Sequence, residues 1–358
     1  MCIRDSAKTA QGGSNYYPDV IYRGSQYVYW MDHNSSGSNW GTDVTAAYTA
    51  VNQPTYNALA GGTDDYSLTA GELEDAYDKF KNTEELTIDV IIGGPSPTDS
   101  AAGGDTHVTM ITSLVDERKD CVATVSPYRS ATVGVTSSVT QTRNVCEFFD
   151  LCPSSSYVIY DSGYKYMYDK YNDTFRFVPL NGDTAGLVAA VDSDVAPWFS
   201  PAGYTRGVYR GAIKLSYNPK QSERDQLYRK RINPVVNFSG QGVTLFGDKT
   251  ALAKPSAFDR INVRRLFLIL ERTIAEAAKY QLFEFNDEFT QSQFKAMVEP
   301  FLREIQSRRG ITDYTVICNE SNNTPDVIDR NEFKADIYVQ PARSVSYTHL
   351  TLPTSDLV

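Results

Sequence analysis

Three stretches near the C-terminus decide the fold of this 358-residue chain. They read INPVVNFSGQGVTLFGDKT (232–250), FDRINVRRLFLILERTIAEAAKYQLFEFND (258–287) and FKADIYVQPARS (333–344). The first has the composition of a strand interrupted by glycines. The second repeats apolar residues every three or four positions, which predicts a long amphipathic helix. The third alternates apolar and polar residues, which predicts a half-buried closing strand.

Two helices are predicted between the first and the last of these stretches. Ser256 and Asp259 resemble a capping box at the start of the first helix. Its apolar stripe comprises Val263, Phe267, Leu270, Ile274, Ala278, Leu282 and Phe285. The second helix is predicted over residues 290–309, contains Pro300 and ends at Gly310 as its C′ residue. Its stripe comprises Phe294, Met297, Phe301 and Ile305.

The upstream half alternates strands and helices. Strands are predicted at 88–92, 121–125 and 157–160, with helices at 104–118 and 138–150 between them. This order predicts right-handed βαβ units on a largely parallel sheet. A hairpin over 164–178 and a helix over 184–194 follow. Before them, Thr69 and Glu72 form a capping box for a helix ending near Lys81, and residues 27–33 resemble a strand.

Composition restricts the functional classes. A hydrophobic content of 41% and a charged content of 22% are typical of a globular protein. The longest apolar run, 266–270, is far shorter than the roughly 20 residues of a membrane span. Five irregularly spaced cysteines suggest neither a disulfide framework nor a zinc pair, which favours a reducing compartment.

Charge is distributed unevenly along the chain. Residues 1–205 carry 12 basic and 26 acidic side chains, whereas residues 206–310 carry 19 basic and 11 acidic ones. The net charge of −10 argues against a nucleic-acid binder. The basic block predicts either a charge-complementary protein partner or a set of solvated helix faces, and the sequence leaves both open.

A hydrolase was weighed because the α/β region could hold one. His107 follows a glycine-rich segment at a helix start, and Ser96 and Ser126 follow predicted strands. No G-x-S-x-G elbow supplies a nucleophile, so a structural histidine is the favoured interpretation of His107. The few histidines and scattered aspartates do not form the ligand density of a zinc or calcium site.

The ordered motifs of the C-terminal third resemble the contractile-tail sheath proteins of bacteriophages. The resemblance rests on the N-P-V and G-x-G of 231–250, on Arg264-Arg265 and Glu271, and on Phe285-Asn286-Asp287. Farther along, the order is completed by Gly310, Asn319, Asn322, Pro325, Arg330, Ala335-Asp336-Ile337 and Pro341-Ala342-Arg343. Together these motifs span about 115 residues.

This resemblance implies an α/β protein in three parts. They are a β-rich N-terminal segment (7–86), a subtilisin-like α/β domain with a largely parallel sheet (87–250), and a C-terminal α+β domain (251–345). It implies a structural, non-enzymatic subunit without cofactors. The expected location is the virion tail after assembly in the host cytoplasm. The implied partners are further copies in stacked rings, the tail tube, and the baseplate and tail terminator proteins, but no nucleic acid or membrane.

Both ends of the chain look foreign to it. Residues 1–6 and 346–358 resemble translated adapter sequence, with native tails as the alternative. We expect an internal fragment of a longer protein that lacks the family's extended arms. The assembly interface hypothesised from the resemblance and the charge pattern comprises Arg260, Arg264, Arg265, Arg272, Phe333, Ile337, Val339 and Arg343. We expect the excess of basic charge to lie on one exposed face that includes some of Arg260, Arg264, Arg265 and Arg272.

Two alternatives remain at this stage. One is the sheath of a related contractile injection or secretion system. The other, from a different class, is an α/β hydrolase or ligand-binding enzyme. Neighbouring genes would separate the first alternative from a phage sheath, and a deep polar pocket in an unassembled monomer would favour the second.

Overall fold

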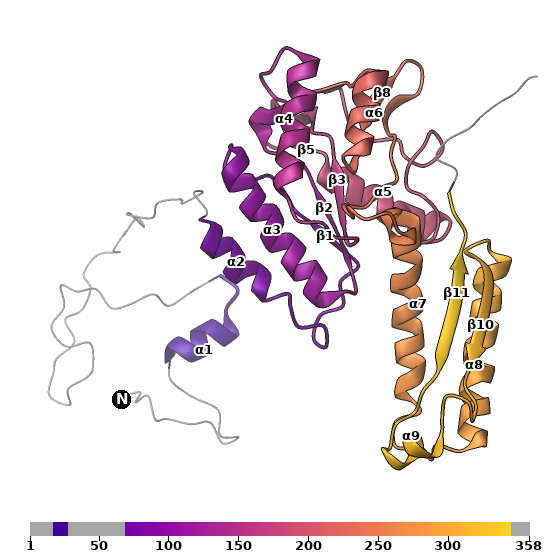
Figure 1. Cartoon of the computed structure of the whole chain (residues 1–358). Coiled ribbons are helices and arrows are strands. Elements are labelled where there is room, and N and C mark those ends of the chain that lie inside the picture. Colours follow the sequence, from indigo (N-terminus) through magenta and orange to yellow (C-terminus); the bar gives the residue numbers. More distant parts are fainter. Residues whose placement is uncertain (1–16, 28–68, 345–358) are drawn as a thin grey trace, which may run out of the picture. The chain divides into compact units, whose positions relative to one another are not determined.

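The computed structural model describes residues 17–27 and 69–344 (Figure 1). The chain divides into two units, Met1–Asp64 and Asp65–Val358. The described part of the first unit contains helix α1 (Tyr17–Gly24). Most of the predicted β-rich segment, and all but one residue of the strand expected at 27–33, lie outside the described residues. The domain boundaries at 86/87 and 250/251 therefore stay predictions.

The second unit begins with helix α2 (Ala70–Asp78), which is capped as predicted. The Thr69 hydroxyl accepts from the backbone N–H of Glu72, and the Glu72 carboxylate accepts from that of Thr69 at 2.8 Å. This capping box satisfies two backbone donors that would otherwise have no partner in the helix. The helix ends three residues before the predicted Lys81.

A four-stranded parallel sheet lies at the centre of the second unit, which confirms the predicted α/β architecture. Its strand order is β1-β2-β3-β7, and every neighbouring pair is parallel. The strands are β1 (Val90–Ile92), β2 (Val122–Val125), β3 (Val158–Asp161) and β7 (Ile232–Asn233). Helices α3 (Ala101–Arg118), α4 (Ser138–Leu151), α5 (Asn181–Asp194) and α6 (Gln221–Arg229) join and cover them.

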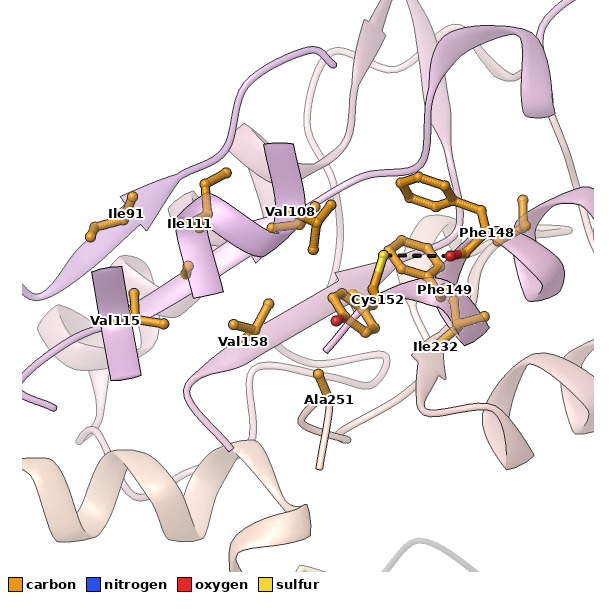
Figure 2. Close-up of a cluster of buried hydrophobic side chains, with 14 of the residues drawn as sticks. Ile91, Val108, Ile111, Val115, Phe148, Phe149, Cys152, Val158, Ile232 and Ala251 are labelled. Atoms are coloured by element: carbon orange, nitrogen blue, oxygen red, sulfur yellow. Dashed lines mark hydrogen bonds between the residues drawn. The ribbon is translucent and has the colours of Figure 1, made fainter. Parts of the chain in front are cut away.

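Both faces of this sheet are buried, because alternate strand residues pack against different helices. On one face, Val158 packs with α3 and α4 through Ile111 and Phe149 (Figure 2). On the other face, Ile159 packs with Val188 of α5. The same face contacts Ile261 and Leu268, which belong to the long C-terminal helix. The C-terminal part is therefore a layer of the sheet domain as well as a domain with its own core.

Two small antiparallel sheets flank the parallel one. The first has the order β5-β4-β6, formed by β4 (Tyr164–Asp169), β5 (Thr174–Pro179) and β6 (Lys214–Leu215). The hairpin expected over 164–178 is its β4–β5 pair. The second is the hairpin of β8 (Val235–Phe238) and β9 (Gly242–Leu245). Gly240 and Gly242 have φ of 80° and 78°, in the left-handed region that glycine adopts readily, and they shape the connection of this hairpin.

The C-terminal part consists of two antiparallel helices and a two-stranded sheet. Its elements are α7 (Ile261–Lys279), α8 (Glu288–Ser307), β10 (Ile311–Ile317), α9 (Pro325–Asp329) and β11 (Asp336–Pro341). Figure 1 shows β10 and β11 along the two helices. Leu270, Phe294, Leu302 and Val316 belong to the apolar core between these layers. The sheet pairs antiparallel from Ile317 opposite Asp336 to Ile311 opposite Pro341.

The ends of α7 differ from the prediction. Ser256 caps a short 3-10 turn (Ala257–Asp259), and Arg260 is the N-cap residue of α7. The helix then stops at Lys279, so the last two residues of the predicted stripe lie beyond it. Leu282 and Phe285 are 63% and 84% exposed instead of buried.

Helix α8 also differs in detail. Met297 is 40% exposed, while Val298 and Leu302 take the buried positions beside Phe294. The left-handed residue after the helix is Arg309, with φ of 66°, and not the predicted Gly310. The Gly310 N–H donates to the Ile305 carbonyl at 2.9 Å, as expected of the C″ residue in a Schellman motif.

The closing strand has the predicted alternation. Phe333, Ala335, Ile337 and Val339 pack against the C-terminal core, whereas Lys334, Asp336 and Tyr338 are exposed. One face of β11 therefore contributes to folding, and the other is available to solvent.

Candidate assembly interface

Arg264 lies buried between helix α7 and the start of strand β3. Its Nη2 donates to Ser156 Oγ at 2.7 Å, and its guanidinium stacks over the rings of Tyr157 and Phe258 at 4.2 Å and 4.0 Å. Only 7% of the residue is exposed. Burial lowers the pKa of Arg264, since the charged form is partly removed from water.

Arg265 joins the same helix to α5. Its guanidinium pairs with both carboxylate oxygens of Asp192 and lies 3.4 Å from the Val188 carbonyl. The residue is 5% exposed. About two turns farther along, Arg272 pairs with Asp89 at 2.6 Å and donates to the Asp120 carbonyl at 3.1 Å.

The expectation of an exposed basic face is therefore wrong for Arg264 and Arg265. The prediction treated α7 as a helix with one solvated side. The first two turns of α7 are instead enclosed by the parallel sheet, by α5 and by the core of the C-terminal part. Arg264, Arg265 and Arg272, which we term the arginine clamp, connect α7 to segments before β1, β2 and β3 and to α5. These contacts hold the C-terminal helix to the sheet domain.

The remaining arginines of the hypothesised interface lie beside a cavity. Arg260 is half-buried, donates to the Tyr228 hydroxyl and lies 3.4 Å from Asp259. Arg343 follows β11 and is exposed. Both line a cavity of about 1290 Å³ that also borders Arg206, Arg224 and Arg309. Sequence reasoning missed this cavity because its lining comes from separate segments of the chain.

Phe333, Ile337 and Val339 face inward, so their side chains contribute to the core of this chain. The side chains on the opposite face of β10 and β11 point away from the C-terminal core. Among the described residues, neither strand has a second strand as neighbour. Both edges of this two-stranded sheet can accept an additional strand by backbone hydrogen bonding.

The residues considered for hydrolysis have structural contacts. Ser126 Oγ donates to Asp161 Oδ2 at 2.7 Å and accepts from the Asn181 N–H at 3.0 Å. Asp161 also accepts from the Gly163 N–H at 3.0 Å, and burial raises its pKa to about 8. These bonds connect the ends of β2 and β3 to the start of α5. His107 is 3% exposed on α3 against Tyr77, and burial lowers its pKa.

Residues 17–27 and 69–344 contain no group of three or more histidine, cysteine or acidic side chains suited to a metal ion. None of the helices in these ranges is both long enough and apolar enough to cross a bilayer.

Comparisons with protein families match almost the whole described region. Residues 43–251 match the phage tail sheath protein central domain, and residues 253–352 match the phage tail sheath C-terminal domain. The two matches are consecutive and meet within the loop before α7.

Comparisons with single proteins point the same way. The tail sheath protein of Enterobacteria phage T4 is 40% identical over 94% of this chain and 51% of its own length. That of Vibrio phage KVP40 is 43% identical over 81% of this chain and 45% of its own length. The chain thus spans about half the length of the curated relatives it matches.

Solved structures share the fold at lower identity. The sheath of an extracellular contractile injection system, PVC, in its contracted state superposes with a TM-score of 0.64 at 19% identity, covering 78% of this chain and 75% of that one. The contracted helical sheath of the anti-feeding prophage gives 0.63 at 18% identity, covering 81% and 76%.

Proposed function

This chain belongs to the phage tail sheath family, and from that premise we propose that it is the folded core of a contractile tail sheath subunit. Copies of the subunit polymerise as stacked rings around the tail tube of a virion. On triggering, the sheath shortens and drives the tube through the host envelope. The tail tube, baseplate and tail terminator proteins are its partners, and assembly takes place in the host cytoplasm.

The observation that carries this proposal is the pair of consecutive family matches over 43–352. Identity to the T4 and KVP40 tail sheath proteins of 40% and 43% supports it across both matched regions. We infer a whole-protein role for this chain because it matches both the central and the C-terminal domain of tail sheath proteins.

The arginine clamp suits a subunit that transmits force. Each of its guanidinium groups connects α7 to a different part of the sheet domain, so a load applied to the C-terminal part passes into the sheet through these contacts. We infer that the parallel-sheet part and the C-terminal part of the second unit move together during contraction. The energy then comes from exchanging contacts between subunits, and the reaction needs no catalytic site.

The β10–β11 sheet, whose two edges are not paired with another strand among the described residues, suits strand addition between subunits. An arm from a neighbouring subunit would add a strand, with backbone hydrogen bonds giving affinity and alternate side chains giving register. An unpaired edge is otherwise a site of irregular association. We therefore infer that arms connect the subunits while the core supplies rigidity.

A second candidate is the sheath of a contractile injection system. The fold likeness to the PVC and anti-feeding prophage sheaths favours it, although their identity to this chain is only 18–19%. Phage capsid and portal genes beside the coding sequence support the phage sheath, and toxin-delivery genes in their place support the injection system.

Electron microscopy tests the proposal directly. The chain would be extended at both ends with the corresponding segments of the T4 tail sheath protein and co-expressed with its tail tube protein. Ordered tubes with a striated outer layer are expected. A soluble monomer that forms no tubes, or hydrolase activity that Ser126→Ala abolishes, would contradict the assignment.

A further inference from the structure

We propose that the loop between α7 and α8 of one subunit docks into the arginine-lined cavity of a second copy of this chain. We use the term aromatic loop for the connecting residues 280–287 together with the first two residues of α8, Glu288 and Phe289. The inference deepens the proposed function, on which it rests, by assigning one contact between sheath subunits.

The cavity carries an excess of positive charge. Its lining contains five arginines (Arg206, Arg224, Arg260, Arg309 and Arg343) against two aspartates, Asp225 and Asp248. In the region that the structure describes, only Arg260 of these five pairs with a carboxylate. A volume of about 1290 Å³ exceeds the usual 300–1,000 Å³ of small-molecule pockets, so a polypeptide segment suits it better.

The aromatic loop has the complementary chemistry. Its sequence is YQLFEFNDEF, with three acidic side chains, Glu284, Asp287 and Glu288. Its large apolar side chains are strongly exposed: Tyr280 78%, Leu282 63%, Phe283 105%, Phe285 84% and Phe289 75%. Exposed apolar patches of this kind mark interaction sites. Aromatic rings and arginine also attract each other through cation–π contacts.

Side-chain hydrogen bonds fix the conformation of the aromatic loop. Asn286 Nδ2 donates to the Glu332 carbonyl at 2.8 Å, and Asn286 Oδ1 accepts from Gln291 Nε2 at 2.9 Å. Phe283 has φ of 70°, a left-handed conformation that bulky residues rarely adopt. Such backbone strain concentrates at functional sites, and here it presents a fully exposed aromatic ring.

The loop cannot reach the cavity of its own chain. Arg260 and Asn262 of the cavity lie at the N-terminal end of α7, and the loop follows its C-terminal end. A helix of 19 residues separates the two by about 28 Å. The contact is therefore between two copies. Because the two surfaces differ, it is heterologous and adds subunits head to tail, as an open helical assembly requires.

The test is self-association of this chain, measured by sedimentation velocity over a range of concentrations at low salt. Two variants each remove one side of the contact: Phe283→Ala with Phe285→Ala on the loop, and Arg309→Glu with Arg343→Glu at the cavity. Each should weaken association at least ten-fold. Arg229→Glu with Arg303→Glu reverses the same charge on exposed helix positions outside the cavity and should leave association unchanged.

Mixing the two variants gives a sharper outcome. The loop variant retains an intact cavity, and the cavity variant retains an intact loop. A head-to-tail contact therefore predicts a one-to-one complex in the mixture, although each variant alone stays monomeric. Circular dichroism on each variant confirms that both remain folded.

A wild-type chain that remains monomeric, or association that neither variant weakens, overturns the proposal. Association lost in the loop variant without complex formation in the mixture also overturns it. The extended chain separates this inference from the proposed function. Tubes that form despite the loop substitutions would reject the docking and leave the sheath assignment intact, whereas a mixed complex without tubes would do the reverse.

Discussion

Arg265 of α7 and Asp192 of α5 form an ion pair inside the subunit across 73 positions of sequence. The Arg265 side chain is 6% exposed and the Asp192 side chain 32%. The pair fixes the start of the C-terminal helix against the face of the sheet that α5 covers. Together with the stacking of Arg264, it makes the junction between the two parts a packed interior.

Arg265→Ala should destabilise the folded chain. Removing one partner of a buried pair leaves the other charge uncompensated, which costs 3–5 kcal/mol when both are fully buried. Because Asp192 is partly exposed, we expect about 2 kcal/mol, measured by urea unfolding. Arg303→Ala, on the exposed face of α8, should change the unfolding free energy by less than about 0.5 kcal/mol. Equal effects for the two variants would contradict the buried pairing.

Arg264→Glu with Arg265→Glu should abolish the native fold. If both arginines lay on an exposed basic face, as the charge pattern indicates, the double reversal would leave folding intact and weaken assembly. Placing two carboxylates beside Asp192 and in a largely buried site leaves several charges unpaired. Loss of cooperative thermal unfolding, followed by circular dichroism, is the expected result. A folded double mutant that merely fails to assemble would restore the original interpretation.

The structure could be predicted from the sequence where the local sequence patterns all indicate the same element. The capping box at Thr69, the βαβ order of the sheet and the alternation of β11 all depend on neighbours within a few positions, and all three are confirmed. The prediction failed at Arg264 and Arg265 because their burial depends on Asp192 and Ser156, more than 70 residues upstream. No local pattern distinguishes an arginine on a solvated helix face from one enclosed by a distant sheet.

The same reasoning explains the errors at the helix ends. Apolar residues continue at helical spacing to Phe285, so the pattern extends α7 past Lys279. The following helix already begins at Glu288 with Asp287 as its cap, which leaves the intervening residues for the connecting loop. The helical periodicity therefore predicted burial for apolar residues of the aromatic loop that are in fact exposed.

Gly310→Ala should destabilise the C-terminal part. A Cβ at this position would lie 2.6 Å from Ile305 Cγ2 and 3.1 Å from the Trp198 ring. Overpacking of this kind costs about 1–3 kcal/mol. Gly186→Ala is the matched control, because it lies in α5 with nothing near the added Cβ and should stabilise the helix by up to about 1 kcal/mol. Differential scanning calorimetry should therefore show shifts of opposite sign.

Asp161→Asn should stabilise the protein above neutral pH. Burial raises the folded-state pKa of Asp161 to about 8, whereas an unfolded aspartate has a pKa of about 3.9. Between these values the folded chain binds a proton that the unfolded chain has released, so unfolding free energy falls as pH rises. The loss is complete above the folded pKa.

The asparagine amide imitates the protonated carboxyl and cannot ionise. Wild type and variant should therefore differ little near pH 4 and by at least about 1 kcal/mol at pH 8.5, measured by urea unfolding at both values. Asp194→Asn, an exposed position, serves as the control and should show no such gain. A variant that loses stability equally at both pH values would show that Asp161 is ionised in the folded chain.

Substitutions on the two faces of β11 should separate folding from assembly. Ile337 packs against the C-terminal core and Tyr338 is 61% exposed. Ile337→Asp places an unpaired charge inside the C-terminal core and should prevent folding of the C-terminal part.

Tyr338→Asp should leave the melting temperature within a few degrees of wild type. In the arm-extended chain it should reduce the yield of tubes, because an added strand would place its side chains beside this position and cross-strand pairs contribute about 0.2–1 kcal/mol each. Negative-stain microscopy after sedimentation measures the tube yield. An unchanged tube yield with Tyr338→Asp would show that subunits do not join through this face of the sheet.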